Sequence, residues 1–181
     1  MTTTPRSAVF LDRDGVINES LSRNGVQVPP QTLEEFRILP GVPAALNKLR
    51  NAGYLLVVVT NQPDVARGTQ DVSMIERMHD YLRSQLDLDD IFVCTHDDAD
   101  DCDCRKPRPG MILSAINKYH IEPATSFMVG DRWKDISAGF RAGCRTVLVG
   151  QIGQDTMPDE PTIRLSELSE VADWIIEQTF D

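Results

Sequence analysis

The 181-residue sequence predicts an α/β fold with a doubly wound, mainly parallel sheet. Short, nearly continuous apolar runs alternate along the chain with longer stretches whose apolar residues recur every three or four positions. The first pattern is typical of strands buried on both faces, and the second of helices that cover such a sheet. Three of the runs also end in a polar residue of similar kind, as expected where parallel strands open onto a ligand crevice.

The expected elements follow in a regular order. Strands are predicted by the apolar runs, which cover residues 8–11, 54–59, 91–94, 126–129 and 146–149. Helices are predicted by the apolar stripes, which cover residues 42–49, 75–86, 109–119, 136–140 and 168–175. Pro43 suits the first turn of the first helix and Gly53 its end, and Ser166 suits the N-cap of the last helix. Segments 18–35 and 151–162 are expected to be loops.

Composition limits the classes of function. The net charge of −10 argues against binding of nucleic acid or of an anionic membrane over the general surface. No apolar stretch approaches the roughly 18 residues of a membrane span, and segment 1–7 lacks the apolar part of a secretion signal. We expect one domain, residues 1–181, in a cytoplasmic monomer.

The cysteines and histidines divide into a cluster and isolated residues. In a reducing cytoplasm four cysteines, three of them within eleven residues, suggest metal ligands more than disulfides. The fourth, Cys144, is expected to lie in the core beside a strand. His79 and His120 have helical surroundings and no partner cluster, so both are expected to be structural.

Two aspartates follow the first apolar run. Side chains alternate along an extended segment, so Asp12 and Asp14 project to the same side. Two such carboxylates repel each other unless a cation or a shared proton relieves the repulsion. The pair therefore suits divalent-metal binding and acid–base work, with one carboxylate as the nucleophile. The alternative is a polar turn, since Asp and Gly are common turn residues.

The second polar ending is Thr60-Asn61-Gln62. Its hydroxyl, amide and backbone N–H groups together suit an anion cradle, which makes Thr60 and Asn61 candidate phosphate-binding residues. A plain strand-to-helix turn is the alternative.

The third polar ending is Asp131, with Asp135 four residues further on, on the same face of a helical turn. Asp135 either supports Asp131 and the water shell of a metal or caps the helix 136–140. If the three strands are neighbours, their endings meet in one crevice, which weakens the interpretation of the aspartate pair as a turn.

A lysine lies between these motifs. Lys106 directly precedes Pro107, and proline holds the residue before it in an extended conformation, which fixes the direction of the lysine side chain. A directed ammonium near carboxylates and an anion cradle suits a phosphoryl group. Most lysines are solvated, so the neighbouring motifs single this one out.

In combination, these motifs resemble the four motifs of the haloacid dehalogenase superfamily, over residues 8–149. The resemblance implies that Asp12 attacks phosphorus and forms an aspartyl-phosphate. It implies that Asp14 protonates the leaving alcohol and later deprotonates the hydrolytic water. Thr60 and Lys106 would bind the phosphoryl oxygens. Asp131 would complete a Mg²⁺ site with Asp12 and the backbone carbonyl of Asp14, which fits the preference of Mg²⁺ for a few oxygen ligands.

The clustered cysteines precede Arg105-Lys106 directly. Cys94, His96, Cys102 and Cys104 form the pattern C-x-H-x5-C-x-C. Three thiolates and one imidazole make a closed tetrahedral zinc set that leaves no open position for catalysis. The spacing differs from that of the usual zinc fingers, and the alternative is a loop with three unrelated cysteines. We expect a structural Zn²⁺ that fixes the loop 94–104.

This pattern narrows the resemblance to small zinc-containing phosphatases that act on D,D-heptose 1,7-bisphosphate or on histidinol phosphate. Segments 60–68 and 106–111 resemble the heptose branch, whereas the short interval between His96 and Cys102 resembles the histidinol branch. Pro63-Asp64 and the segment 23–31 depart from the heptose pattern. Removal of the C7 phosphate of D-glycero-D-manno-heptose 1,7-bisphosphate is the expected reaction, and hydrolysis of histidinol phosphate is the alternative.

Members of this kind lack a lid domain, so the resemblance implies that loops recognise the leaving group. Arg105 is expected to contact substrate, and segments 18–35 and 61–68 to form the rim. Two other classes of function stay open. One is a signalling receiver that accepts a phosphoryl group on aspartate, although a receiver needs no acid two residues after that aspartate. The other is a noncatalytic binding module clipped by zinc.

Overall fold

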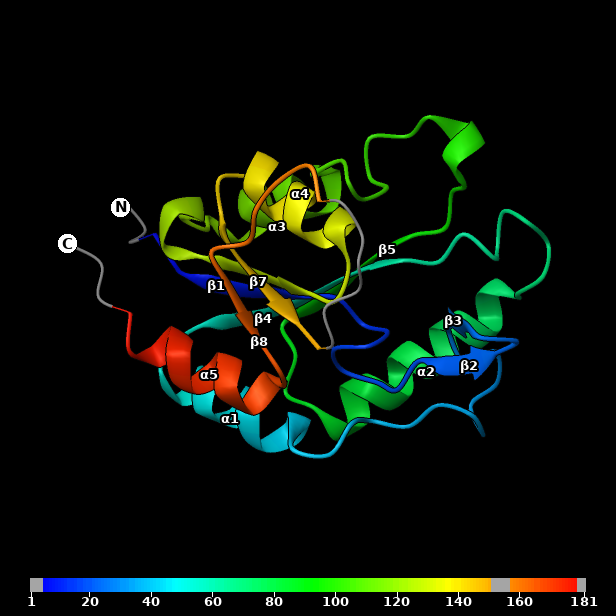
Figure 1. The fold of residues 1–181 in the computed structure, drawn as a ribbon, viewed down its shortest axis with the longest axis horizontal. Helices are drawn as coiled ribbons and strands as arrows, with labels where there is room; N and C mark the ends of the chain where they lie inside the picture. Colours follow the sequence, from blue (N-terminus) through cyan, green and yellow to red (C-terminus); the bar gives the residue numbers. More distant parts are fainter. Residues whose placement is uncertain (1–4, 151–156, 179–181) are drawn as a thin grey trace.

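The computed structural model describes residues 5–150 and 157–178, which form a six-stranded parallel sheet with helices on both faces (Figure 1). The strand order is β5-β4-β1-β6-β7-β8. The strands are β1 (Ala8–Leu11), β4 (Leu55–Asn61), β5 (Asp90–Cys94), β6 (Phe127–Gly130), β7 (Arg145–Val149) and β8 (Ile163–Leu165). This architecture confirms the predicted α/β fold, and the described residues contain no separate cap domain.

Strand β1 lies at the centre of the sheet. It pairs in parallel with β4 and with β6, and Leu11 is in register with Val58 on one side and Val129 on the other. All four residues of β1 are buried, as its continuous apolar sequence predicts. The three polar endings predicted from the sequence therefore do follow neighbouring strands.

Helices cover the sheet in two layers (Figure 1). One face packs against α1 (Val42–Asn51), α2 (Val72–Gln85) and α5 (Leu168–Ile176), and the other against α3 (Gly110–Tyr119) and α4 (Trp133–Arg141). Because side chains alternate along a strand, Val9 and Leu11 belong to the first layer, whereas Ala8 and Phe10 belong to the second. None of the described helices has the length and apolar character needed to cross a membrane.

Segment 18–35, expected as a loop, contains a hairpin of β2 (Leu21–Arg23) and β3 (Val26–Val28). Its turn is Asn24-Gly25, and both residues have positive φ, 53° and 77°. An Asn-Gly pair favours this type of two-residue hairpin turn, so the sequence did carry a signal for it.

Two further details differ from the sequence predictions. The N-cap of α5 is Glu167, so the prediction of Ser166 was wrong by one residue. Strand β8 was not predicted because it is only three residues long and half-buried. The loop predicted at 151–162 lies partly outside the described residues, and the described part, 157–162, forms neither helix nor strand.

A close approach of α4 to the sheet positions the third polar ending. A Cβ atom on Gly139 would lie 2.4 Å from Cβ of Met128, so only glycine lets the helix pack this closely on β6. A Cβ atom on Gly130 would lie 2.1 Å from Cβ of Asp135. The Asp135 side chain thus lies directly against the end of β6, beside the crevice.

Candidate active site and cysteine–histidine cluster

A cavity of about 700 Å³ opens at the carboxyl ends of the central strands. The sequence-predicted residues that line it are Asp12, Asp14, Asn61, Arg105, Lys106, Asp131 and Asp135. The remaining walls come from the β2–β3 hairpin and Pro29, the segment after β4, the start of α4, Leu148 of β7 and Met157. The predicted residues alone come from four regions far apart in the sequence, and these meet in one crevice, as the strand endings predicted.

Lys106 is the electrostatic centre of this cavity. Its buried ammonium donates to Oδ1 of Asp12 at 2.8 Å and to Oδ1 of Asp135 at 2.6 Å. It also donates to the backbone carbonyl of Val59 at 2.8 Å. Burial alone would lower the pKa of Lys106, but the two carboxylates outweigh it and raise the pKa above its usual value. The lysine therefore stays charged.

A third carboxylate, that of Asp131, lies close to the two that bind this ammonium. Oxygens of Asp12, Asp131 and Asp135 lie within 4.8 Å of one another. Burial, together with the charge of Asp12, raises the pKa of Asp131 to about 8. Among the described residues, the buried Oδ1 of Asp131 has no hydrogen-bond partner. An orphaned carboxylate oxygen beside a second carboxylate fits a hard divalent cation such as Mg²⁺.

The absence of a side chain at Gly15 lets the Asp131 carboxylate lie close to the segment that carries Asp12 and Asp14. The φ of Gly15 is +89°, and a Cβ atom there would lie 2.4 Å from Oδ2 of Asp131. A side chain at position 15 would therefore push the Asp131 carboxylate away from Asp12.

Asp14 is held apart from the other carboxylates. It accepts hydrogen bonds from Nη2 of Arg13 at 3.0 Å, from Nδ2 of Asn18 at 2.9 Å and from Nε2 of Gln62 at 2.8 Å. Burial opposes ionisation of Asp14, but the charge of Arg13 and these hydrogen bonds outweigh it, so the pKa of Asp14 is lowered. The two aspartates of the first motif thus have different environments.

The second polar ending contributes mainly by positioning. Asn61 exchanges a pair of hydrogen bonds with the backbone of Lys106, at 3.0 and 3.1 Å, and so fixes β4 to the lysine segment. Thr60 is fully buried, and its hydroxyl accepts a hydrogen bond from Gln62 at 2.9 Å. Among the described residues Thr60 does not line the cavity, unlike its neighbour Asn61.

Asp135 fulfils the capping role that the sequence left open, and its support of Asp131 and of a metal's water shell stays a prediction. Its Oδ2 accepts a hydrogen bond from the backbone N–H of Arg132 at 3.1 Å, which satisfies a donor at the start of α4. Its Oδ1 accepts a hydrogen bond from Lys106 at 2.6 Å, so Asp135 joins the start of α4 to the lysine.

Charged pairs join the loops at the rim. Nε of Arg105 lies 2.7 Å from Oδ1 of Asp98, and Nε of Arg67 lies 2.7 Å from Oδ2 of Asp97. Both arginines line the cavity, and their partners lie in the loop after β5. The rim thus carries two guanidinium groups whose charges are offset by this loop.

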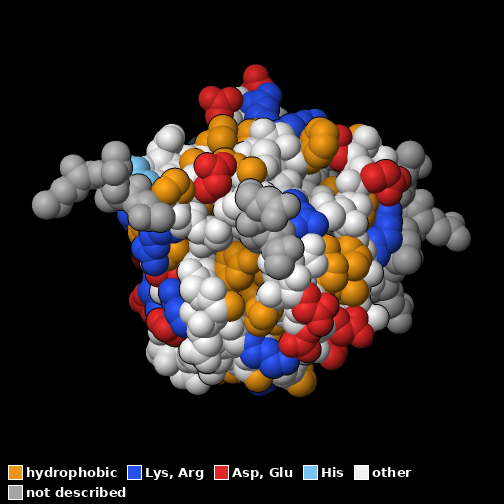
Figure 2. All heavy atoms as spheres, turned by 90° about the vertical axis from the view of Figure 1, so that its left-hand side faces the viewer, with side chains coloured by type: hydrophobic (Ala, Val, Ile, Leu, Met, Phe, Trp, Pro, Cys, Tyr) orange, Lys and Arg blue, Asp and Glu red, His pale blue; other side chains and the backbone are white. Residues whose placement is uncertain are grey.

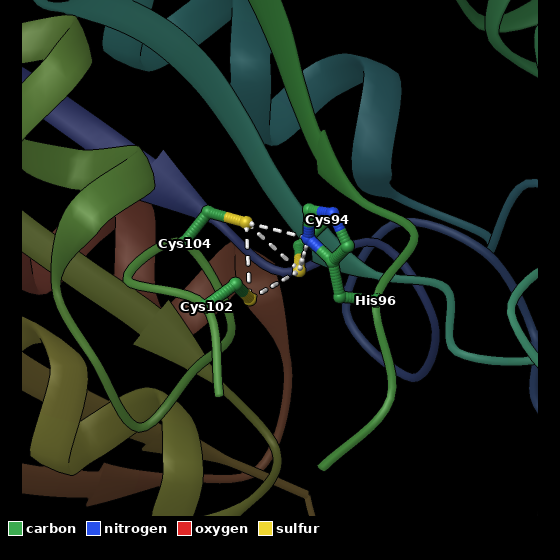
Figure 3. Close-up of side chains that lie close together, drawn as sticks. All are labelled: Cys94, His96, Cys102 and Cys104. Atoms are coloured by element: carbon green, nitrogen blue, oxygen red, sulfur yellow. Dashed lines mark hydrogen bonds between the residues drawn. The ribbon is translucent and has the colours of Figure 1, made fainter. Parts of the chain in front are cut away.

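The predicted zinc residues converge at the base of that loop, and their side chains point toward one another (Figure 3). The three sulfur atoms lie 3.1 to 3.6 Å apart, much longer than the ~2.05 Å of a disulfide. Nδ1 of His96 lies 3.3 Å from Sγ of Cys104 and 3.6 Å from Sγ of Cys94. A zinc tetrahedron with bonds of about 2.3 Å has edges of roughly 3.8 Å, so four ligand atoms at these separations fit Zn²⁺.

Sequence reasoning missed three residues that the site uses. Arg13 lies between the two aspartates and is fully buried, Gln62 bridges Asp14 and Thr60, and His79 of α2 contacts Arg13. His79 lies on the apolar stripe of Ile75, Met78 and Leu82, which was a signal that it faces inward. His120 lies exposed at the end of α3, and Cys144 is buried as predicted.

The fold and this group of side chains define a phosphatase of the haloacid dehalogenase type, and the model of the HAD-hydrolase-like family matches residues 103–171. The D-glycero-beta-D-manno-heptose-1,7-bisphosphate 7-phosphatase of Pasteurella multocida is 39% identical over 165 residues, covering 85% of this chain and 86% of the relative. The protein of the same name from Escherichia coli K12 is 35% identical over 186 residues, covering 96% and 90%. This chain belongs to the family of heptose-bisphosphate phosphatases.

Solved structures agree with the sequence relatives. A D,D-heptose 1,7-bisphosphate phosphatase from B. bronchiseptica, complexed with magnesium and phosphate, superposes with a TM-score of 0.82 at 32% identity. That match covers 96% of this chain and 99% of the other. The corresponding protein from Burkholderia thailandensis has a TM-score of 0.67 at 27% identity, covering 96% and 100%. The resemblance inferred from the motifs is confirmed.

Proposed function

We propose that this protein is a Mg²⁺-dependent phosphomonoesterase that removes the C7 phosphate of D-glycero-D-manno-heptose 1,7-bisphosphate. The observation that carries this proposal is the Asp12–Lys106–Asp131 arrangement in a cavity of about 700 Å³. The substrate is the one that the names of the sequence relatives state. A magnesium ion and a phosphate in the B. bronchiseptica relative support the same chemistry.

In the proposed site, Asp12, Asp131 and the backbone carbonyl of Asp14 hold Mg²⁺, and Asp135 supports them from behind. The ion supplies positive charge that offsets the repulsion between the nucleophile and the phosphoryl oxygens. Lys106 adds a fixed ammonium beside the same oxygens. Asn61 keeps β4 and the lysine segment in register around the phosphoryl group, and Thr60 holds Gln62 beside it.

The proposed reaction has two displacements at phosphorus. An oxygen of Asp12 attacks phosphorus, the bond between phosphorus and the sugar oxygen breaks, and Asp14 gives its proton to that oxygen. Asp14, now ionised, takes a proton from water, whose oxygen attacks phosphorus and releases Asp12 and inorganic phosphate. The lowered pKa of Asp14 keeps the carboxylate ionised, and so able to accept the proton of water, in the second step. Donation in the first step requires that Asp14 take up a proton as the phosphomonoester binds.

Arg105 and Arg67 give the rim its proposed role in substrate recognition. A bisphosphate carries a second anionic group, and guanidinium groups bind phosphate through two parallel hydrogen bonds. In this proposal the substrate replaces Asp98 and Asp97 as partners of these arginines.

The test of this function is phosphate release by purified protein with Mg²⁺ from both anomers of heptose 1,7-bisphosphate and from histidinol phosphate. Histidinol phosphate is the second candidate because only five residues separate His96 and Cys102. We expect a higher kcat/KM for a heptose bisphosphate. Comparable or better turnover of histidinol phosphate would overturn the choice of substrate, and no release from any monoester would overturn the enzyme.

We also propose that the cysteine–histidine cluster holds one structural zinc ion. Elemental analysis of the purified protein is expected to find about one zinc per chain, and Cys104→Ser is expected to lose it. Cys144→Ala is the matched control, since Cys144 is buried outside the cluster and its loss should leave the zinc content unchanged. Equal zinc in wild type and Cys104→Ser would contradict the assignment.

The surface supports a small-molecule partner rather than a polyanion. Figure 2 shows basic and acidic side chains interspersed on one face, with no continuous basic patch among the described residues in view. The net charge of −10 also disfavours binding of a polyanion over the general surface. We propose a monomer that works in the cytoplasm, and light scattering on the purified protein tests its mass.

A further inference from the structure

A buried series of side chains runs from the cavity into the core through Asp14, Arg13 and His79. Arg13 is 0% exposed. Its Nη2 lies 3.0 Å from each carboxylate oxygen of Asp14, and its Nη1 lies 3.2 Å from Nε2 of His79. A guanidinium group has donors only, so Nε2 of His79 must be the acceptor. The histidine therefore bonds to the side of Arg13 that faces away from the carboxylate.

The state of His79 fits this role. Burial and the neighbouring charge of Arg13 lower the pKa of His79 to about 3, so the ring is neutral. A neutral ring that accepts at Nε2 carries its proton on Nδ1. The Phe36 ring contacts the same guanidinium, with its centroid 5.5 Å from Cζ of Arg13. A hydrogen bond and an aromatic ring together hold Arg13 from the core side.

Orientation matters because of what Asp14 does. General acid catalysis requires the carboxyl group within hydrogen-bond reach of the departing oxygen, and small displacements cost rate. Arg13 donates to both carboxylate oxygens of Asp14. A guanidinium without an anchor behind it would therefore leave Asn18 and Gln62 alone to orient that carboxylate. A buried acceptor behind the guanidinium supplies that anchor, as second partners do for metal ligands.

We propose that His79 is a positioning residue for proton transfer: it holds the Arg13 guanidinium, which holds the Asp14 carboxylate toward the leaving oxygen. This inference rests on the proposed function, since it takes Asp14 as the acid. His79 itself contacts neither substrate nor metal in this assignment. Its effect therefore depends on how much the leaving group needs a proton.

The test compares two substrates of the Mg²⁺-loaded enzyme through kcat/KM, which reports the steps up to departure of the leaving group. Heptose 1,7-bisphosphate loses a sugar alkoxide, which must be protonated as it leaves. Para-nitrophenyl phosphate loses a stable phenolate, which leaves without a proton. A misplaced acid therefore slows the first substrate and spares the second, whereas a general loss of folded enzyme slows both equally.

Two variants separate the effect of the hydrogen-bond acceptor at position 79 from the effect of side-chain packing there. His79→Leu keeps an apolar side chain in the buried position but removes the acceptor, and His79→Gln keeps an acceptor oxygen. We expect His79→Leu to lower kcat/KM for the bisphosphate about tenfold more than for the aryl ester. We expect His79→Gln to restore the ratio of the two values to within about threefold of wild type. His120→Asn, at an exposed helix end, is the matched control and should leave both values unchanged.

Arg13→Lys gives an independent measurement if His79→Leu does not fold, because lysine offers one nitrogen where arginine binds His79 through Nη1 and Asp14 through Nη2. It should show the same selective loss on the bisphosphate. Parallel losses on both esters, or identical behaviour of the leucine and glutamine variants, would overturn the positioning role. If folded wild type hydrolyses neither ester, the proposed function itself fails, which is a separate outcome.

Discussion

Replacing Asp12 by asparagine is expected to abolish phosphate release while leaving the protein folded. The asparagine amide cannot form the acyl-phosphate bond, and removal of a nucleophile lowers kcat by on the order of 10⁴-fold or more. Asp12 also shares a cluster with Asp131 and Asp135, and the ammonium of Lys106 binds two of these three carboxylates, Asp12 and Asp135. Neutralising one of them lowers the repulsion, and Lys106 keeps Asp135 as its partner.

The two effects of Asp12→Asn can be measured on the same sample. Phosphate release reports the activity, and thermal unfolding in Mg²⁺-free buffer is expected to give a midpoint no lower than that of wild type. Asp80→Asn is the matched control, because Asp80 pairs with Arg83 on the exposed face of α2. Residual turnover within about a hundredfold of wild type would argue against Asp12 as the nucleophile.

Replacing Lys106 by methionine is expected to damage stability as well as activity. Methionine has a similar length but no charge, so the buried carboxylates of Asp12 and Asp135 lose their shared partner. Removing one member of a buried ion pair typically costs 3–5 kcal/mol of unfolding free energy, so a loss of about that size is expected in Mg²⁺-free buffer. Loss of the ammonium beside the phosphoryl oxygens should lower kcat by about 10²–10³-fold.

Urea unfolding measures the first effect of Lys106→Met and phosphate release the second. The matched control is Lys48→Met, which breaks the exposed pair between Lys48 and Asp173. An exposed pair contributes only about 0–1 kcal/mol, so the control should unfold almost like wild type. Equal destabilisation by the two substitutions would mean that the charges around Lys106 do not hold the site together.

The sequence predicted five of the six strands of the parallel sheet and all five described α-helices, because most of these elements carry their own periodicity. Buried strands such as β1 and β4 are continuous apolar runs, and the amphipathic helices have clear stripes. Strand β8 has no such pattern, since its three residues are half-buried and take their place from pairing with β7. The β2–β3 hairpin was predictable only from its Asn-Gly turn.

The site residues that sequence reasoning found lie directly at strand ends or beside proline, where the chain itself fixes their direction. The residues it missed depend on tertiary contacts. An arginine between two aspartates is normally exposed, and Arg13 is buried only because Phe36 and His79 enclose its guanidinium. The stripe on α2 indicates that His79 faces inward, but no local pattern identifies its partner on another element.

The strand order has a consequence for how activity is acquired during folding. β1 precedes all the other described strands in the chain, yet it lies inside the sheet and needs β6 on one side. A nascent chain therefore holds Asp12 and Asp14 long before Lys106 and Asp131 exist to surround them. Parallel pairing over such long separations makes folding slow. Refolding chains should consequently regain turnover only in the last step of folding, when the whole sheet is formed. A fragment that ends before β6 should have no catalytic activity.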